Sequence, residues 1–166
     1  QSKGLVATSM SDIAERAKVG RVTVYRHFPD ETALAGACSG QYFERHPLPD
    51  PEPWRSVEDA TKRLSRGLRE TYAYHRETEA MITSVLADAR DLPVMAPYHA
   101  HWQHAADVLT AAWPATGRNK VLLNAGILLA LSFDTWRTLI QVRGLTDAQA
   151  IKLMLRLTCH WPPNSR

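Results

Sequence analysis

Cysteine is scarce in this sequence, and no motif would cross-link the cysteines or hold zinc. Only Cys38 and Cys159 are present among 166 residues, without CxxC or Cys/His finger spacing around them. A disulfide-rich scaffold or a structural zinc site is therefore not expected, although one bridge between the two remains open. Because such a composition suits a reducing cytosol, we expect a cytoplasmic protein.

Long hydrophobic runs are also missing. The most apolar stretch, VLLNAGILLALSF, is interrupted by Asn124 and followed by Asp134 and Arg137. A membrane span needs about 20 consecutive apolar residues, so this stretch indicates a buried helix instead. The first residues, QSKGLVATS, contain no apolar signal core. The sequence therefore predicts no membrane segment.

Local signatures of common enzymes are absent too. The sequence contains no nucleophile elbow, P-loop, paired-carboxylate site or dinucleotide-binding fingerprint. We therefore expect neither an enzyme nor a cofactor. An all-helical catalytic site assembled from distant residues remains an alternative, because it would leave no local signature. The net charge of +3 permits an anionic partner without requiring one.

Helical periodicity is present over most of the chain, and no segment alternates as a strand does. We therefore predict an all-α fold. The proline-rich stretch HPLPDPEP, residues 46–53, interrupts the helices and separates two regions. Residues 1–46 form a small polar region, and residues 47–166 contain long helices and all five tryptophans.

Start and stop signals locate the long helices. Residues 56–59 resemble a capping box and open a helix that we expect to yield near His75 to another one. Pro97 fits the first turn of the next helix. A long apolar helix is predicted over residues 118–142, and the last helix over residues 147–158. Its capping box is Thr146-Asp-Ala-Gln149, and Gly144 before it is a carboxyl cap.

The first region has the pattern of a helix-turn-helix. SDIAERAK predicts one helix, and VGRVTVYRHFPDET supplies a turn at Val19 and Gly20 and a second short helix at residues 21–28. Two short helices joined by a turn of about three to four residues form this motif. Val24 and Phe28 are four residues apart and are expected to face inward.

The outward positions of the second short helix are basic and polar. Arginine can bond a guanine edge or a phosphate, hydroxyl groups can bond phosphate, and a methyl group can touch the thymine methyl. A solvated helical hairpin would have a similar surface and is the alternative. The outward residues are Arg21, Val22, Thr23, Tyr25, Arg26 and His27.

The whole stretch SMSDIAERAKVGRVTVYRHFPDETAL resembles the DNA-binding signature of the TetR family of bacterial transcriptional repressors. The resemblance lies in the I-A-x-x-A pair, the valine of the turn, and T-V-Y-R-H-F before a proline turn. It implies phosphate contacts at the first helix, base contacts at the second, and sugar-phosphate contacts beyond them. The residues implied are, in that order, Ser9 and Ser11, then Arg21, Val22 and Thr23, then Tyr25 and His27.

The sequence departs from the family's pattern at several positions. Lys18 stands where the family usually has glycine, and Gly20 where it has serine or threonine. Glu31 stands where the family often has lysine, so we expect no phosphate contact there. The chain also begins where the family's first helix would end. Since a three-helix unit is the smallest such core, we expect about fifteen to twenty residues before Gln1.

The resemblance further implies a homodimer through the last two helices, at about 118–142 and 147–158. An extensively apolar helix needs cover on both sides, which a partner subunit supplies, or else a self-contained bundle core. The apolar residues are Leu122, Leu129, Trp136, Leu139 and Ile140 on the first helix and Ile151, Met154, Leu155 and Thr158 on the second.

A ligand pocket in the second region is implied as well. Aromatic and methionine walls with a few polar tips are typical of small-molecule clefts, and they predict a largely apolar, planar or aromatic effector. The candidate lining residues are Tyr72, His75, Met81, Met95, Tyr98, Trp102, Phe133 and Trp136.

Together these features predict a bacterial, nucleoid-associated repressor that binds a near-palindromic DNA operator as a dimer and is released by a small effector. The expected lever is the helix from Ser56 to His75, with the proline break as its joint. One alternative is a metal-responsive regulator using His99, His101 and His104, although solvated surface histidines explain this cluster better. Another is a helical ligand-binding protein or enzyme that does not bind DNA.

Overall fold

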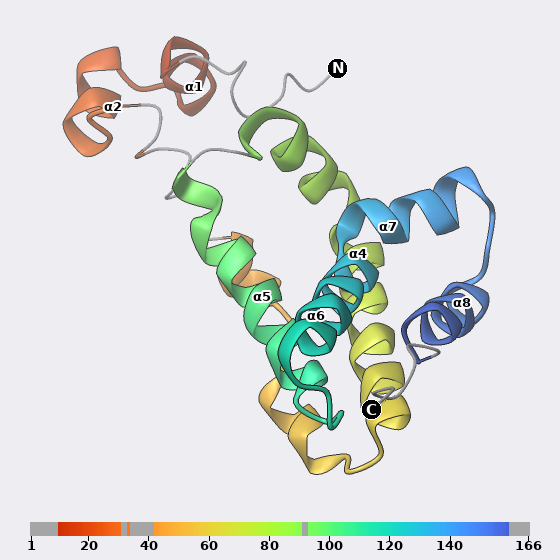
Figure 1. Ribbon diagram of the computed structural model, residues 1–166. Coiled ribbons are helices and arrows are strands. Elements are labelled where there is room, and N and C mark those ends of the chain that lie inside the picture. Colours follow the sequence, from red (N-terminus) through yellow and green to blue (C-terminus); the bar gives the residue numbers. More distant parts are fainter. Residues whose placement is uncertain (1–9, 31–32, 34–41, 91–92, 160–166) are drawn as a thin grey trace. The chain divides into compact units, whose positions relative to one another are not determined.

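The computed structural model describes residues 10–30, 33, 42–90 and 93–159. Every regular element in these ranges is helical, which confirms the all-α class (Figure 1). The chain divides into two compact units, Gln1–Leu48 with Thr78–Pro97, and Pro49–Glu77 with Tyr98–Arg166. The functional division into residues 1–46 and 47–166 stays a prediction. None of the described helices is long and apolar enough to cross a membrane.

Helices α1 (Met10–Ala17) and α2 (Arg21–His27) confirm the helix-turn-helix expected in the first unit (Figure 1). The end of α1 is closed by two backbone bonds: Lys18 N–H donates to Glu15 O and Val19 N–H to Ala14 O. Such a pair of bonds requires a left-handed residue between helix and turn, and Lys18 adopts it with φ 54°. The glycine usual in the family at this position would do so without strain.

Helix α4 (Ala60–Ala89) corrects the prediction of two helices meeting near His75. It is one continuous helix because residues 68–89 contain no glycine or proline that would interrupt it. Its start also differs from the predicted one. Asp59 accepts a hydrogen bond from the Lys62 N–H at 2.7 Å, whereas Ser56 belongs to the short 3-10 helix η1 (Glu52–Ser56).

The predicted helix at residues 118–142 is also wrong as a single element. It consists of α6 (Gly117–Leu131), α7 (Phe133–Arg137) and a π-helical turn, η3 (Thr138–Val142). Ser132 separates the first two because its backbone is extended, at φ −67° and ψ 142°, and its hydroxyl caps the Thr135 N–H. A hydrophobic run cannot reveal a cap of this kind, because serine is also tolerated inside helices.

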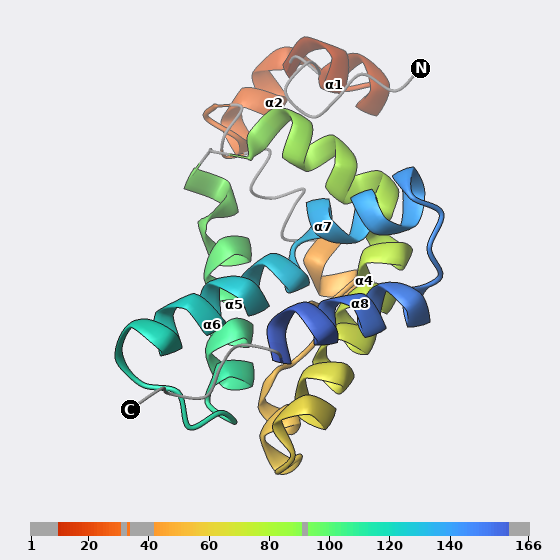
Figure 2. The same ribbon diagram turned by 45° about the vertical axis from the view of Figure 1, so that its right-hand side comes forward.

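The carboxyl-terminal prediction is confirmed in detail. Helix α8 (Asp147–Cys159) begins after the expected capping box, in which Thr146 N–H donates to Gln149 Oε1 and Gln149 N–H donates to Thr146 Oγ1. Gly144 has a φ of 67°, as a carboxyl cap requires. Helices α6 and α8 lie side by side in both views of the molecule (Figures 1 and 2).

The second unit has a large apolar core shared by α4, α6 and α5 (Ala96–Thr110), which follows the 3-10 turn η2 (Pro93–Met95). Gly67 permits Leu109 of α5 and Trp54 of η1 to pack closely against the backbone of α4. A Cβ atom at Gly67 would lie 3.0 Å from a Leu109 methyl and 3.3 Å from the Trp54 ring. The large side chains of this unit with no more than trace exposure are Trp54, Leu64, Leu68, Tyr72, His75, Val108, Leu109, Ile127, Leu131 and Trp136.

Candidate functional site

Helix α2 is held by a small apolar cluster. Val24 is 6% exposed and packs with Ala14 of α1, and the partly buried Phe28 lies against both. Val24 and Phe28 therefore face inward, as their four-residue spacing predicts. This cluster fixes which side of α2 is left for a partner.

The opposite side of α2 is open to solvent. Val22 and Tyr25 are 83% and 52% exposed, although both have large apolar surfaces that a folded chain usually covers. No acidic residue lies in the first turn of α2, and its last turn contains Arg26 and His27. The predicted contact residues thus share one accessible basic surface, with Arg21, Arg26 and His27 exposed and Thr23 partly exposed.

The start of α2 is weakly capped. Gly20 is its N-cap in extended conformation, and its carbonyl accepts from the N–H groups of Thr23 and Val24. No side chain caps the helix, because glycine lacks the hydroxyl that the family usually has there. The first N–H groups of α2 therefore receive no hydrogen bond from a capping side chain.

Two predicted positions cannot be placed. Ser9 and Glu31 lie outside the described residues, and only the backbone of Ser11, within α1, is described. Their expected roles stay predictions.

In the second unit, aromatic rings surround the imidazole of His75. The ring centroids of Trp102, Phe133 and Trp136 lie 5.3, 5.4 and 5.8 Å from that of His75. Tyr72 is farther away at 6.5 Å. These five residues, which we call the His75 cluster, were all predicted as pocket residues, and α4, α5 and α7 supply them.

Of the other three predicted pocket residues, only Tyr98 belongs to the same compact unit as the cluster. Tyr98 is buried and lies edge-on to Trp102 at 6.0 Å. Met81 and Met95 belong to the other compact unit and are not placed relative to the cluster. Tyr74, which was not predicted as a pocket residue, has its ring centroid 6.0 Å from that of His75 and 6.1 Å from that of Trp102. Its position next to His75 in a helix gave no periodic signal.

Two side chains of α4 fasten the cluster to the end of α6. The Tyr72 hydroxyl donates to Ala130 O at 3.2 Å, and His75 Nε2 lies 2.8 Å from Leu131 O. Both carbonyls belong to the last turn of α6, where the break at Ser132 removes the usual helical donors. The cap at Ser132 thereby creates the acceptors that fix the His75 ring.

Burial sets the protonation of both groups. It lowers the pKa of the His75 imidazole to about 4, although the bond to Leu131 acts in the opposite direction. Burial also raises the pKa of the Tyr72 hydroxyl far above its ordinary value. Both groups are therefore neutral at physiological pH, so His75 cannot form an ion pair with a ligand there.

Arg76 connects this cluster to α8, a link that the sequence did not predict. Its guanidinium lies over the Trp136 ring, 5.9 Å from the centroid. The same group makes two bonds to Asp147, at 2.7 and 3.2 Å, in the first turn of α8. The pair is half exposed, so its effect on stability is small, but its fork geometry fixes the start of α8 against α4.

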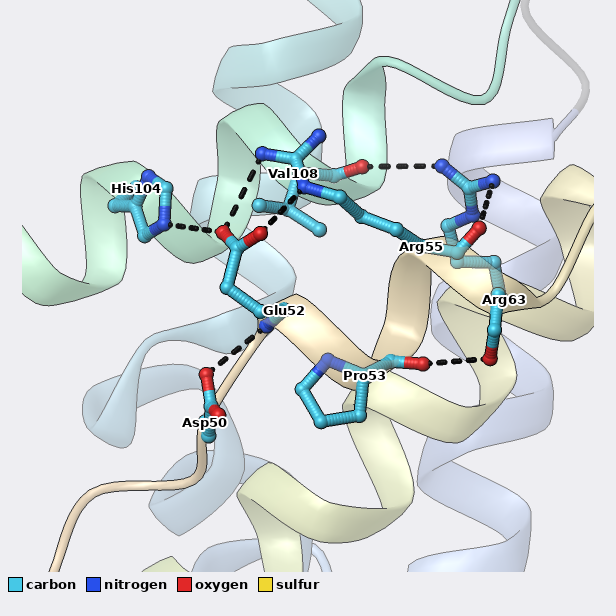
Figure 3. A network of polar contacts seen from close by, with 8 residues as sticks. Asp50, Glu52, Pro53, Arg55, Arg63, His104 and Val108 are labelled. Carbon is cyan, nitrogen blue, oxygen red and sulfur yellow. Dashed lines mark hydrogen bonds and ion pairs between the residues drawn. The ribbon is translucent and has the colours of Figure 1, made fainter.

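The end of the proline-rich break is bonded into the second unit (Figure 3). Glu52 accepts from Arg55 at 2.8 Å and pairs with His104 at 2.8 Å, and these two partners lower the pKa of its carboxyl group. Arg63 of α4 donates to the carbonyls of Val57 and Arg55. Residues 52–57 are thus anchored to α4 and α5. A flexible joint, as expected for the proline-rich break, would not need these bonds.

The three histidines of the predicted cluster differ in their surroundings. His104 pairs with Glu52, and burial lowers the pKa of the half-buried His101. His99 is exposed. Within the described ranges, no group of three or more histidine, cysteine or acidic residues is arranged to hold a metal ion.

Part of the expected dimer surface is buried within the protomer. Trp136, Ile151, Met154 and Thr158 are at most 9% exposed, because they pack in the core of the second unit. The exposed large apolar residues of the last helices are others, namely Val121 and Leu129 on α6, Val142 on η3, and Leu153 and Leu157 on α8. Apart from Leu129, none of these was predicted.

An exposed basic helix-turn-helix followed by a helical domain is the architecture of a DNA-binding transcriptional regulator. Residues 1–38 match the family model described as bacterial regulatory proteins, tetR family. The first part of the chain is therefore similar to the DNA-binding region of this family of bacterial regulators. No curated protein and no solved structure matches the chain.

Proposed function

We propose that this protein is a ligand-responsive repressor that binds a near-palindromic DNA operator as a homodimer in the bacterial cytoplasm. The observation that carries the proposal is the surface of α2. Val24 faces inward, and the basic and hydroxyl side chains around it remain accessible. An α-helix with this surface fits the major groove of B-DNA.

Arg21, Val22 and Thr23 are assigned to base edges, because the amino-terminal residues of a recognition helix reach farthest into the groove. Tyr25 and His27 are assigned to the sugar-phosphate backbone. In a dimer, the two recognition helices would lie roughly 34 Å apart, one turn of DNA. A small, mostly apolar effector bound in the second unit would favour another separation and so weaken operator binding.

The exposed apolar residues of α6 and α8 support the dimer. Val121, Leu129 and Leu157 are each about 60% exposed, so both helices present large apolar side chains to solvent. The two helices lie side by side, so their exposed residues can form one self-complementary surface. Leu157→Glu should convert the dimer to a monomer in sedimentation, whereas Arg69→Glu, at an exposed position of α4, should not.

The test of DNA binding is operator selection with the full-length protein at moderate salt. Recovery of a palindromic site is expected, and recovery of unrelated sequences only would contradict the proposal. On the selected site, Arg21→Ala should cost roughly 1–3 kcal/mol and relax one base position. Tyr25→Phe should weaken binding to all sequences by a similar factor. Arg69→Ala is the matched control, because it removes an exposed arginine outside α2.

A further inference from the structure

Three buried polar atoms of the His75 cluster have no hydrogen-bond partner in the structure. They are His75 Nδ1, Trp102 Nε1 and Trp136 Nε1. The other two side-chain polar atoms of the cluster are bonded, since the Tyr72 hydroxyl and His75 Nε2 reach carbonyls. Elsewhere in the unit, the buried Trp54 indole donates to Glu70. Because buried polar groups in proteins are almost always paired, these three atoms around one ring provide hydrogen-bonding capacity that a bound group would satisfy.

The hydrogen-bonding roles of these atoms follow from chemistry. A carbonyl oxygen can only accept, so the short contact with Leu131 O requires the proton on His75 Nε2. The imidazole is neutral in its buried position, and its Nδ1 is therefore an acceptor. Each indole can only donate. The cluster thus offers one acceptor and two donors, surrounded by aromatic faces.

No charged side chain belongs to the cluster itself. Arg76 lies on the outer side of Trp136, where it is half exposed and bonded to Asp147. A carboxylate ligand would therefore be buried without a cation and would have no proton for His75 Nδ1. An ammonium group would be buried without an anion, which is similarly unfavourable.

Building on the proposed function, we propose that the effector is an uncharged aromatic molecule with a hydroxyl group, such as a phenol. Its O–H donates to His75 Nδ1, and its oxygen accepts from the indole N–H of Trp102 or Trp136. A hydroxyl group suits this site because a single oxygen both donates and accepts. The aromatic body of the molecule packs against the rings of Phe133 and Tyr72.

The test is calorimetric titration of the full-length protein with three matched probes: 2-naphthol, its methyl ether and 2-naphthoate. Naphthol should bind about tenfold more tightly than the ether, because the ether cannot donate, and naphthoate should not bind measurably. Equal binding of naphthol and ether would overturn the proposal, as would tighter binding of naphthoate. If none of the three probes binds, ordered water alone fills the site, and this result would also overturn the proposal.

Variants locate the effect. His75→Phe should reduce the naphthol preference to below about threefold, while His75→Gln, which keeps a donor for Leu131 O and an acceptor, should retain part of it. If His75→Phe fails to fold, Trp102→Phe and Trp136→Phe provide the same test, because either or both should weaken naphthol more than the ether. Trp54→Phe is the control, since its indole already has a partner in Glu70, and it should leave the preference unchanged.

These titrations contain no DNA, so the two proposals fail separately. A protein that selects an operator but does not distinguish naphthol from its ether contradicts the effector class alone. A protein that prefers naphthol but selects no operator contradicts the repressor and leaves the binding site in place.

Discussion

The helix-turn-helix and the second unit place their functional residues in opposite environments. Around α2, the apolar cluster consists of Ala14, Val24 and Phe28, and the residues assigned to DNA are on the surface. In the second unit, the residues assigned to the effector, such as His75 and Trp136, are completely buried. The proposed partners differ in the same way, with large charged DNA for the first region and a small uncharged effector for the second.

Charge shows the same difference. In the second unit, Arg55, Arg66 and Arg76 are paired with Glu52, Glu70 and Asp147. Arg21 and Arg26 make no ion pair with any described residue. Arginines that are not paired within the protein can displace counterions when they contact DNA phosphate, so we expect operator affinity to depend strongly on salt.

The largest expected effect tests whether stability is concentrated in the second unit. Trp54→Ala should lower the free energy of unfolding by about 3–5 kcal/mol, because a fully buried ring is lost and Glu70 loses its donor. Val24→Ala, in the smaller cluster, should cost only about 2 kcal/mol. Urea unfolding of both variants gives the comparison, and equal costs would show that the two regions are similarly packed.

A pH titration tests the burial of His75 itself. The unfolded imidazole has a pKa near 6.5 and the folded one a pKa of about 4, so only the unfolded chain gains this proton between those values. The contribution is fully present above pH 6.5. As the pH falls from 6.5 to 4, the free energy of unfolding should decrease by about 3 kcal/mol from this group. This decrease should be missing in His75→Gln, which serves as the control because its carboxylates contribute the same pH dependence as those of the wild type.

Lys18 tests whether the turn of the helix-turn-helix is strained. Lys18→Gly should stabilise the motif by about 1 kcal/mol, because glycine adopts a φ of 54° without the clash of a Cβ atom. Amide hydrogen exchange in α2 should become roughly fivefold slower. Lys18→Ala removes the charge but keeps the Cβ, so it should not slow exchange. If it does so equally, charge and not backbone conformation explains the effect.

The smallest expected effect concerns the missing cap of α2. Gly20 has an extended backbone, and a Cβ there would come no closer than 4.0 Å to the nearest atom outside its chain neighbours, Thr23 Oγ1. Gly20→Ser should therefore stabilise α2 by a few tenths of a kcal/mol, because its hydroxyl can accept from the Thr23 N–H. Exchange of that amide should slow slightly. Gly20→Ala, which has no hydroxyl, should give no protection at Thr23.

The elements predicted well are those encoded by neighbouring residues. The inward and outward faces of α2 follow from four-residue spacing, and the start of α8 follows from the reciprocal bonds of Thr146 and Gln149. Local signals that several neighbouring residues can give were less reliable. The break at Ser132 was missed, and the start of α4 was placed at Ser56 instead of Asp59, since several residues there can cap a helix.

The candidate site shows the same limit. Aromatic composition indicated most of the His75 cluster, but not that Leu131 O would fix the imidazole or that Arg76 would join Trp136 to Asp147. Both contacts connect residues more than 50 positions apart in the chain. Likewise, Ile151 and Met154 are apolar at helical spacing, which does not distinguish a face covered by the same chain from one covered by a partner.

The sequence alone determined the helical class, the helix-turn-helix and its basic surface, because these depend on hydrogen bonds and side-chain spacing within a few residues. Only the tertiary structure decided which polar atoms are left without partners around His75 and which apolar residues of α6 and α8 remain exposed. The physical reason is that burial depends on which helices pack together, and helices that pack together bring distant parts of the chain into contact.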